Sequence, residues 1–457
     1  MFGIMNEIDV LLTKYNKAVP RYTSYPTVPY WYNFDGTERW EQNICKRYNA
    51  EKIQGISLYI HLPFCESLCT YCGCNKKITT NHNVEDEYID AVLKEWRLYC
   101  DLLGEKPLIR EIHLGGGTPT FFSACNLEKL LHGIFKTAVL HPQKEFGFEG
   151  HPNNTTIEHL TTLYNLGFTR VSYGVQDDDP VVQRSINRLQ PFENVAKATE
   201  NARKVGYESV NFDLIYGLPF QNKSGLENTF NKVIGLRPDR IAFYSYAHVP
   251  WKQKAQRLFD ESNLPSPAEK LELYLTGKRL LTAAGYTDIG MDHFALPSDG
   301  LYKAWVDKTL HRNFMGYTTT HTNFLLGLGV SAISDVGNAY AQNQKELENY
   351  YRSIHAGKLD SVKGIFLTED DEVIKRYILD IACQNKTVLN NEHLPLLQES
   401  TIPRLRELQY DGLVNFEGND LTVTKRGMQF IRNICNAFDQ YGINEGASAI
   451  NMFSKAV

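Results

Sequence analysis

Residues 65–74 read CESLCTYCGC and contain four of the nine cysteines of this 457-residue chain. The stretch directly follows an apolar run, Ile56–His61, which predicts a buried β-strand. Four soft sulfur ligands this close together indicate a metal ion or a metal cluster. Structural zinc usually takes two ligand pairs separated by a longer loop, and neither His61 nor His82 keeps that spacing here.

Cys65, Cys69 and Cys72 suit three corners of a [4Fe–4S] cube, whose irons prefer thiolate ligands. Three protein ligands would leave one iron open, and an open coordination position is typical of a catalytic centre. The spacing therefore favours an iron–sulfur cluster, with zinc and with inert or redox-active cysteines as the alternatives. The other cysteines are scattered, and we expect each to pack as a small apolar side chain: Cys45, Cys100, Cys125, Cys383 and Cys435.

Short apolar runs alternate with helical signals along the middle of the chain, which predicts an α/β fold with a parallel sheet, curled into a full or partial barrel. Thr155 with Glu158 and Ser266 with Glu269 read as capping boxes at helix starts. The apolar run around Gly327-Leu328-Gly329 is expected only to ease packing. The predicted strands are Ile56–His61, Glu111–Leu114, Glu145–Glu149, Arg170–Val175, Ser209–Leu214, Arg240–Tyr246 and Thr287–Met291.

Ligands of such folds bind at the carboxyl ends of the strands, and several polar or flexible residues fall there. The cysteine stretch follows the first strand, and Gly115-Gly116-Gly117-Thr118-Pro119 follows the second. Exposed amides of the glycine loop could hold a carboxylate or an amine-bearing group. Glu149, Gln176 and Asp213 end or follow the next three strands, so that all five segments are expected on one rim.

Further candidates are aromatic and basic residues outside the glycine loop. Tyr59 and Tyr71 flank the cysteines and could place a ring against a ligand, including a sulfonium cation. Arg21 and Arg312 are candidate carboxylate clamps, because a guanidinium binds carboxylates in a bidentate manner. For each of these residues, ordinary packing or a surface position is the alternative.

Composition bounds the class of protein. The chain carries a net charge of −5 with 42% hydrophobic residues, which favours a large folded core and argues against a general nucleic-acid binder. We see no secretory signal at the start and no run of about 18 apolar residues, so a cytoplasmic protein is expected. Three regions are predicted: an N-terminal segment, 1–54, that contributes to the active-site mouth; a barrel domain, 55–360; and a mainly helical C-terminal domain, 361–457, with a winged-helix-like hairpin at 413–424.

Taken together, these motifs resemble the oxygen-independent coproporphyrinogen III oxidases, a family of the radical S-adenosylmethionine (SAM) superfamily. Cys-x3-Cys-x2-Cys after a strand followed by GGGTP resembles the superfamily in general, and the other motifs resemble this family. The likeness extends from about Lys14 to about Tyr441. The family-like motifs are RYTSYPT at 21–27, YIHLPFC at 59–65, CGCNK at 72–76, GVQD at 174–177, DLIYGLP at 213–219, GMDHFA at 290–295, HRNF at 311–314 and YAQNQKE at 340–346.

The resemblance implies a role for each matching position. Cys65, Cys69 and Cys72 would hold the [4Fe–4S] cluster, and Cys74 would be a further family cysteine that is not a ligand. The open iron would bind one SAM, and a second SAM would lie beside it; Tyr59 would act with the cluster in catalysis. Contacts to the first SAM are implied for Tyr59, Gly116, Glu149 and Ile333, and contacts to the second for Tyr71, Gly117, Thr118, Gln176, Arg188, Asp213 and Ala247.

The implied fold is an incomplete parallel β/α barrel with an N-terminal segment and a C-terminal domain over its mouth. The implied reaction belongs to porphyrin and haem biosynthesis: a 5′-deoxyadenosyl radical takes hydrogen from two propionates of coproporphyrinogen III, which become the vinyl groups of protoporphyrinogen IX. The resemblance also implies a small-molecule substrate, an electron donor protein and a monomer, without nucleic acid or membrane.

The chain departs from the family pattern in three places. Gly150-His151, Asp178 and His321-Thr322 replace the usual residues, and we expect all of them near the cofactor rim or the substrate mouth. Two alternatives remain within related proteins: a haem chaperone that binds without oxidising, and a radical SAM methylase acting on haem. The chaperones typically lack the Cys-Gly-Cys ending and the RYTSYP segment that this chain has.

Overall fold

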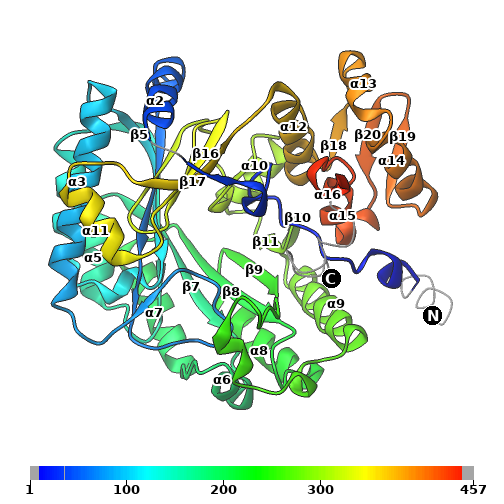
Figure 1. Cartoon of the computed structure of the whole chain (residues 1–457). Coiled ribbons are helices and arrows are strands. Elements are labelled where there is room, and N and C mark those ends of the chain that lie inside the picture. Colours follow the sequence, from blue (N-terminus) through cyan, green and yellow to red (C-terminus); the bar gives the residue numbers. More distant parts are fainter. Residues whose placement is uncertain (1–9, 35–36, 445–457) are drawn as a thin grey trace.

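A computed structural model describes residues 10–34 and 37–444 of the chain. Within these residues, one sheet of thirteen strands forms the centre of the molecule, in the order β1-β17-β16-β15-β14-β2-β5-β6-β7-β8-β9-β11-β10 (Figure 1). The strands from β14 to β9 run parallel to one another, and the strands on either side are antiparallel. The order does not close on itself, so the sheet is an open barrel, as the resemblance implies.

Six predicted strands are confirmed as the parallel core of the sheet, and most are longer than their apolar runs. They are β2 (Ile56–Leu62), β5 (Leu108–Gly116), β6 (Val139–Gly150), β7 (Phe168–Gln176), β8 (Ser209–Tyr216) and β9 (Arg240–Ser245). Their apolar side chains are mostly buried, as expected for strands covered on both faces, except at the start of β6, where Val139 is exposed.

The seventh predicted strand, Thr287–Met291, exists, but it does not belong to the parallel part of the sheet. β10 (Thr287–Gly290) pairs antiparallel with β11 (His293–Ala295) at one edge of the sheet, because the chain turns back directly after it. The seventh parallel strand is instead β14 (Leu325–Leu328), next to β2. A Cβ on Gly327 would lie 2.5 Å from the carbonyl oxygen of Ile333, so this glycine permits the close approach of β14 and its neighbour β15.

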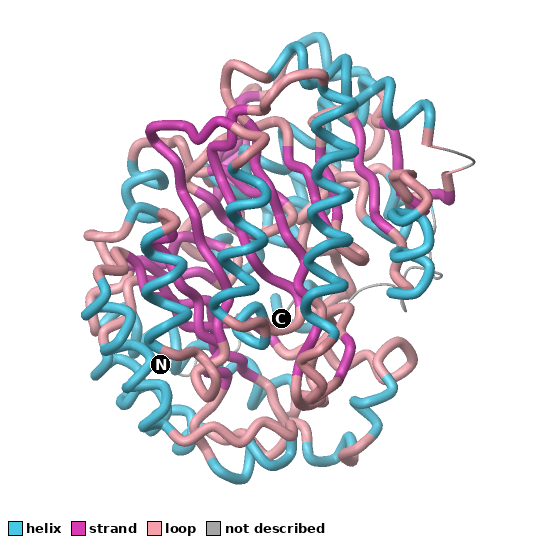
Figure 2. Tube along the Cα trace, turned by 90° about the vertical axis from the view of Figure 1, so that its left-hand side faces the viewer, coloured by secondary structure: helices cyan, strands magenta, loops and turns pink. Residues whose placement is uncertain are grey.

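Helices cover the outer face of the parallel strands (Figure 2). They include α3 (Val84–Leu103), α4 (Ala124–Phe135), α5 (Ile157–Asn165), α7 (Phe192–Val205), α8 (Lys223–Leu236) and α9 (Pro267–Ala283). The box at Ser266 and Glu269 that begins α9 is confirmed. The box predicted at Thr155 and Glu158 is wrong by one residue: Thr156 and His159 form it, since the Thr156 hydroxyl accepts from the amide of His159 and the ring of His159 accepts from the amide of Thr156.

The remaining elements extend the sheet or form its surroundings. Strand β17 lies in the large sheet, which therefore continues past residue 360. The elements that extend or surround the sheet are β1 (Tyr32–Asn33), α2 (Glu38–Glu51), β3 (Phe64–Cys65), β4 (Lys77–Ile78), α6 (Pro180–Ser185), α10 (Gly300–Val306), β12 (His311–Asn313), β13 (Gly316–Thr318), β15 (Ile333–Asp335), β16 (Ala339–Asn343), α11 (Leu347–His355) and β17 (Ser361–Phe366).

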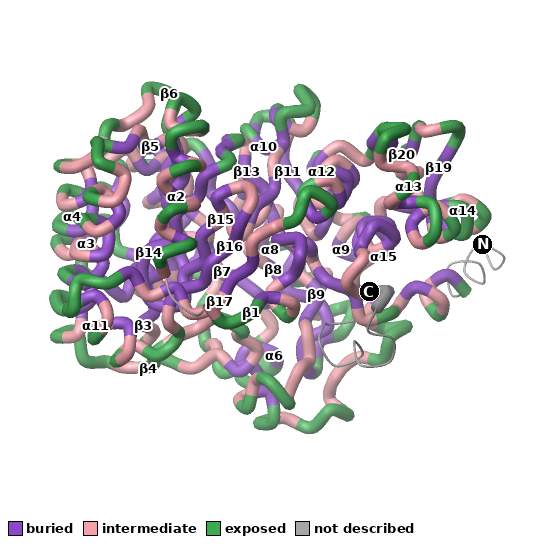
Figure 3. Tube along the Cα trace, turned by 45° about the horizontal axis from the view of Figure 1, so that its top comes forward, coloured by how far each residue is buried: buried purple, intermediate pink, exposed green. Residues whose placement is uncertain are grey.

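A second core lies beyond the sheet, where helices surround a small sheet ordered β18-β20-β19 (Figure 1). The predicted hairpin is present as β19 (Val414–Glu417) and β20 (Asp420–Val423). The other elements are α12 (Glu369–Gln384), β18 (Lys386–Val388), α13 (Leu394–Leu397), α14 (Thr401–Tyr410), α15 (Ile431–Asn436) and α16 (Tyr441–Asn444). Figure 3 shows buried backbone running from the sheet into this region, with exposed residues on the outer helices.

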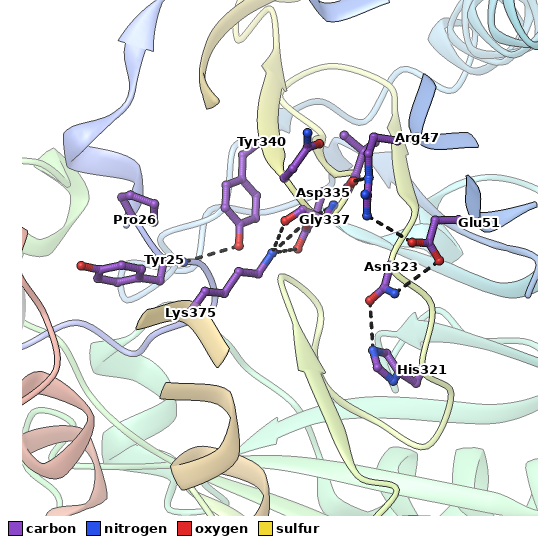
Figure 4. A network of polar contacts seen from close by, with 12 residues as sticks. Tyr25, Pro26, Arg47, Glu51, His321, Asn323, Asp335, Gly337, Tyr340 and Lys375 are labelled. Atoms are coloured by element: carbon purple, nitrogen blue, oxygen red, sulfur yellow. Dashed lines mark hydrogen bonds and ion pairs between the residues drawn. The ribbon is translucent and has the colours of Figure 1, made fainter. Parts of the chain in front are cut away.

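The N-terminal segment joins the two cores. Tyr22 donates from its hydroxyl to Asp439 Oδ2 at 2.9 Å, and the indole of Trp31 stacks on the ring of Tyr340. The partly buried Lys375 of α12 crosses to the sheet, where Nζ lies 3.2 Å from Asp335 Oδ1 and 3.0 Å from the carbonyl oxygen of Gly337 (Figure 4). The C-terminal region thus contacts the sheet through a largely buried ion pair as well as through apolar side chains. None of the described helices is long and apolar enough to cross a membrane.

Candidate cluster and cofactor site

The cysteine loop leaves the end of β2 and is held by backbone hydrogen bonds on both sides. β3 and β4 pair in parallel, with Cys65 opposite Ile78, and the amide of Thr70 donates to the carbonyl of Ile186 at 3.0 Å. The amide of Cys72 donates to the carbonyl of Cys69 at 3.2 Å, which closes a tight turn. These bonds fix the loop, so its thiols are oriented before any ligand binds.

The glycine loop is a support for the cysteine loop. The amide of Gly117 donates to Leu62 at 2.8 Å, and that of Thr118 donates to Phe64 at 3.0 Å. A Cβ on Gly117 would lie 2.5 Å from the carbonyl oxygen of Pro63, so no larger residue fits without displacing the loop. We expected these amides to be free for a ligand. That is wrong for Gly117 and Thr118, because both amides already donate to backbone carbonyls just before the cysteines.

Cys65, Cys69 and Cys72 line one cavity of about 410 Å³. The Thr118 hydroxyl lies 3.3 Å from Cys65 Sγ, and Arg188 donates from Nη1 to Cys69 Sγ at 3.7 Å. The cavity also contains most of the predicted SAM contacts: Tyr71, Gly116, Gly117, Thr118, Glu149, Gln176, Arg188 and Asp213. The structure therefore brings the rim residues of five consecutive strands together around the three thiols.

The charges around the thiols fit a thiolate-bound cluster. Lys76 Nζ donates to the carbonyl oxygen of Cys72 at 3.0 Å, and the hydrogen bond from Cys74 lowers the pKa of Cys72 to about 6. Burial raises the pKa of Cys65 to about 11, although Thr118 opposes the shift. Cationic Lys76 and Arg188 would offset the negative charge of three thiolates. No three His, Cys, Asp or Glu side chains in the described ranges gather closely enough to hold a single metal ion.

Two carboxylates inside the cavity differ in environment. Burial alone would raise the pKa of Glu149, but His113 outweighs it by hydrogen bond and charge, together with the Gly116 amide, so that the pKa lies below its usual value. His113 Nε2 is 3.3 Å from Glu149 Oε1. Burial raises the pKa of Asp213 to about 7, and the charge of Glu149 adds to the shift. Glu149 is therefore suited to pair with a cation, and Asp213 to exchange hydrogen bonds with polar groups.

A second cavity, of about 670 Å³, adjoins the first and shares Cys74, Lys76 and Glu149 with it. Tyr59 and Ile333, both predicted contacts of the first SAM, line this second cavity. Phe314 and Met315, at the turn of the β12–β13 hairpin, close it from the far side. Of the other predicted contacts of the first SAM, Glu149 lines both cavities and Gly116 lines only the cysteine cavity, which also holds all predicted contacts of the second SAM except Ala247.

Ala247 alone among the predicted contacts lines neither cavity. It lies in the loop after β9, where its carbonyl oxygen accepts a hydrogen bond from Gln256 Nε2 at 3.1 Å. Gln256 Nε2 also lies 3.4 Å from the carbonyl oxygen of Tyr71. Ala247 is therefore connected to the cysteine loop through Gln256.

The structure brings the two candidate carboxylate clamps together. Arg21 donates to the carbonyl of Ser245 at 2.8 Å and lies over the ring of Tyr244, which lines the cysteine cavity. Arg312 donates from Nη2 to the carbonyl of Arg21 at 3.3 Å, while its Nε and Nη1 are buried without a hydrogen-bond partner. Near these two guanidinium groups, the carboxylate of Asp292 lies 3.8 Å from Arg21 Nη1.

Sequence reasoning missed several residues of the site. His61 and His113 line the larger cavity. His61 lies in the YIHLPFC motif but was given no role, and His113 lies in none of the quoted motifs. The alternation of strand residues could have identified both, because residues two positions apart on a strand share a face. His113 lies two positions before Gly115 on β5, and His61 lies two positions after Tyr59 on β2.

The three departures from the family pattern do not lie together. His151 lines the cysteine cavity, whereas Asp178 forms an ion pair with Lys232 of α8. Thr322 lies at the amino ends of the strands, where its hydroxyl is 2.6 Å from that of Ser57. His321 and Thr322 line a separate cavity of about 470 Å³ beside α12. The expectation that all three lie at the cofactor rim or mouth is wrong for the last pair, since Ser57 is at the opposite end of β2 from the cysteines.

Most of the scattered cysteines pack as expected. Cys383 and Cys435 are buried, and Cys45 and Cys100 are partly buried, but Cys125 is exposed on α4. The expectation of a packed side chain is therefore wrong for Cys125, which lies on the outer side of its helix.

Known proteins resemble this chain over nearly its full length. Residues 59–233 match the model of the radical SAM superfamily. Oxygen-independent coproporphyrinogen III oxidase of Escherichia coli is 38% identical over 441 residues, covering 94% of both chains. The enzyme of the same name from Pseudomonas aeruginosa is 37% identical over 439 residues, covering 94% of this chain and 95% of the relative.

A solved structure extends the likeness to three dimensions. The coproporphyrinogen III oxidase HemN of Escherichia coli, described as a radical SAM enzyme, superposes with a TM-score of 0.87 at 36% identity. The match covers 94% of this chain and 98% of that one.

Proposed function

Because the chain belongs to the oxygen-independent coproporphyrinogen III oxidases, a family of radical SAM enzymes, we propose that it decarboxylates two propionates of coproporphyrinogen III to vinyl groups without oxygen. The observation that carries this assignment is the convergence of Cys65, Cys69 and Cys72 on one cavity with Glu149, Arg188 and Asp213. The product is protoporphyrinogen IX, an intermediate of porphyrin and haem biosynthesis.

We propose Cys65, Cys69 and Cys72 as the ligands of the [4Fe–4S] cluster. When bound, the cluster and SAM supply hydrogen-atom abstraction by one-electron cleavage of a sulfonium. The difficult chemistry belongs to the cofactors, and the protein places them. Each propionate loses a hydrogen atom, an electron and carbon dioxide, which leaves one vinyl group.

The chain's own residues orient the cofactors and exclude water. Glu149, with its lowered pKa, is placed to hold an ammonium or sulfonium charge, and the half-buried Tyr59 presents its ring to the same cavity. Asp213 and Arg188 lie across the cysteine cavity and offer hydrogen bonds to hydroxyl and carboxylate groups. The pair of adjoining cavities supports two SAM molecules, one against Tyr59, Gly116, Glu149 and Ile333, the other against Tyr71, Gly117, Thr118, Gln176, Arg188 and Asp213.

Arg21 and Arg312 are proposed to hold substrate carboxylates. Two free N–H groups of the buried Arg312 would gain partners from a propionate, and an unpaired buried donor is costly. The N-terminal segment that carries Arg21 would then contribute to the mouth, and the region after β17 would close it. We further propose a cytoplasmic monomer served by an electron donor protein, on the strength of the family alone.

Anaerobic turnover of coproporphyrinogen III by the reconstituted protein, followed by mass spectrometry, tests the assignment. The expected result is the loss of two carbon dioxide molecules per substrate together with formation of 5′-deoxyadenosine. Haem binding without SAM cleavage would instead identify a chaperone, and transfer of a methyl group would identify a methylase. Equilibrium dialysis with labelled SAM separately distinguishes two bound molecules from one.

A further inference from the structure

A group of lysines surrounds the part of the cysteine loop that reaches the surface. Lys77, Lys252, Lys254 and Lys345 are exposed, although the chain as a whole carries a net charge of −5. They come from three segments that are distant in sequence: the end of the cysteine loop, the loop after β9, and the turn after β16. We call these residues, with the partly buried Lys76 and Lys363, the lysine surface.

Hydrogen bonds show that the three segments are in contact. Gln253 lies between Lys252 and Lys254, and its side chain is 3.5 Å from the carbonyl oxygen of Gly73. On the other side, Asn75 donates from Nδ2 to the carbonyl oxygen of Lys345 at 3.0 Å. The lysines therefore border residues 73–77, which directly follow the proposed cluster ligand Cys72.

The positive charges are close enough to influence one another. Burial and the charges of Lys345 and Lys252 lower the pKa of Lys363. Exposed acidic residues near the surface include Glu346, beside Lys345, and Glu66 in the cysteine loop, which lies 3.8 Å from the ring of His82. Trp251, with half of its side chain exposed, adds an aromatic group at the edge of the lysines. A patch of one charge steers a partner of opposite charge, and tryptophan is enriched among the residues that anchor protein interfaces.

The proposed reaction needs one electron for each SAM cleaved, and no group among the described residues supplies it. A donor must come close to the cluster, because electron tunnelling falls steeply with distance. We propose that the lysine surface is the docking site of an acidic one-electron carrier protein, which passes its electron to the cluster through residues 72–77. This inference rests on the proposed function, and it adds the place and the charge of the partner.

Electrostatic steering is the physical reason for choosing a protein of opposite charge. Complementary charge raises association rates by about 10- to 1000-fold, and salt removes the effect within a Debye length of about 8 Å at physiological ionic strength. Lys76 and Lys345 also line the larger cavity, where they could instead attract a tetracarboxylate substrate. The test therefore uses lysines that line neither cavity.

The variant Lys77→Glu/Lys254→Glu reverses two exposed charges of the lysine surface. Its matched control is Lys106→Glu/Lys136→Glu, which reverses two exposed charges at the opposite end of the strands. Lys106 lies shortly before β5, and Lys136 lies shortly before β6. Both are compared with the wild-type reconstituted enzyme, with a purified acidic flavodoxin as the probe. Stopped-flow absorbance gives the rate of cluster reduction by flavodoxin hydroquinone, and calorimetry gives the affinity for oxidised flavodoxin.

We expect the surface variant to lose roughly tenfold or more in reduction rate and affinity at low salt, and to depend less on salt than the wild type. The control variant should match the wild type, and excess dithionite should drive SAM cleavage equally in all three proteins. Equal reduction rates in both variants, or no binding of flavodoxin to the wild type, would overturn the docking site. A raised KM for coproporphyrinogen with unchanged flavodoxin binding would overturn it in favour of substrate steering. Failure of dithionite-driven turnover in the wild type would instead refute the proposed function, while the calorimetry would still decide the docking.

Discussion

Arg188 shows how single residues prepare the cysteine cavity for its ligands. Its guanidinium donates to Cys69 Sγ at 3.7 Å and to the carbonyl oxygen of Gly174 at 2.6 Å, so it is fixed between the cysteine loop and β7. Its Nε is buried without a hydrogen-bond partner. A half-buried cation with a spare, buried donor favours an anionic ligand in this cavity, such as a carboxylate or the cluster's own sulfur.

Replacement of Cys69 by alanine is the sharpest prediction for a single residue. The Cys69→Ala protein should lose its iron and its SAM cleavage together, because a cluster held by three thiolates cannot spare one. Cys383→Ala is the control: this buried cysteine belongs to the second core, and its loss should cost about 1 kcal/mol of stability and no iron. Iron content after anaerobic reconstitution and 5′-deoxyadenosine yield are the measurements. Similar iron contents in the two variants would mean that the ligands are wrongly assigned.

Among single residues, the spacing of the cysteines predicted the cysteine loop. No sequence pattern near the loop predicted which side chains from other strands surround it and set its charge. The convergence of Glu149, Gln176 and Asp213 followed from their places at strand ends, since parallel strands finish on one rim. His113 was missed because its function depends on Glu149 from the next strand. Thr322 was misplaced because the segment after β13 crosses to the far ends of the strands, where Thr318 and Thr322 bond with Glu111 and Ser57.

The elements around the site owe their positions to close backbone contacts. The glycine loop after β5 and the cysteine loop after β2 exchange hydrogen bonds at Gly117 and Thr118, so the two loops form one rigid support. The loops were predictable as neighbours, but their bonding to each other was not, because it depends on how far two adjacent strands extend. Strand β14 was also not foreseen, since four residues that include a glycine carry little strand signal.

Gly117→Ala should separate these two loops. The added methyl group would meet the carbonyl oxygen of Pro63 at 2.5 Å, so the cysteine loop must move, at a cost of about 1–3 kcal/mol. We expect a lower thermal midpoint and substoichiometric iron after reconstitution. Gly235→Ala in α8 is the control, because a Cβ there meets nothing within 4 Å and alanine is the better helix former. If the control protein loses iron to the same degree, crowding at Pro63 is not the cause.

The capping box of α5 makes stability depend on pH. His159 accepts from the amide of Thr156 and donates from Nε2 to the carbonyl oxygen of Phe122 at 2.8 Å, and burial lowers its pKa below the usual 6.5. The folded protein then binds fewer protons than the unfolded chain between the folded pKa and pH 6.5. The stability from this group is therefore present above pH 6.5 and is lost as the pH falls through that window, by up to about 1.4 kcal/mol per pH unit.

His159→Gln should remove this dependence, because glutamine can complete the box without titrating. Denaturant unfolding between pH 5 and pH 7 should show a shallower acid limb for the variant than for the wild type. His355→Gln, at the exposed end of α11, removes a histidine outside the box and serves as the control. Parallel acid limbs for the wild type and His159→Gln would contradict the argument.

At the scale of the whole molecule, the N-terminal segment and the second core both make side-chain contacts with the large sheet. The tyrosine- and proline-rich composition of residues 21–27 indicated a packed segment, and Tyr22 and Tyr25 are indeed in the second core. What the sequence does not indicate is the crossing of Lys375 to Asp335, which lies 40 residues earlier in the chain. Such a pair depends on the docking of α12 against β15 and β16, and no local pattern records that docking.

Lys375→Met should loosen the C-terminal region from the sheet. The change leaves the largely buried carboxylate of Asp335 without its counter-charge. The cost should approach the roughly 3–5 kcal/mol that breaking a fully buried pair costs. We expect a lower midpoint of guanidinium unfolding, with a transition that broadens or splits as the second core separates. The double variant Lys375→Met/Asp335→Asn removes both charges and should recover much of the loss. A double variant that is no more stable than Lys375→Met would exclude an unpaired charge as the cause.

The position of β2 in the strand order has a consequence for biosynthesis. This strand carries the cysteine loop, yet one of its two neighbours, β14, begins only at Leu325. While the ribosome is still adding the residues in between, β2 has an unpaired hydrogen-bonding edge, and the cysteine loop extends from an incomplete sheet. Iron delivery to the nascent polypeptide would therefore be premature. Cells that make this protein should load the cluster after translation has passed β14, and a message truncated before that point should yield an aggregation-prone fragment rather than a partial enzyme.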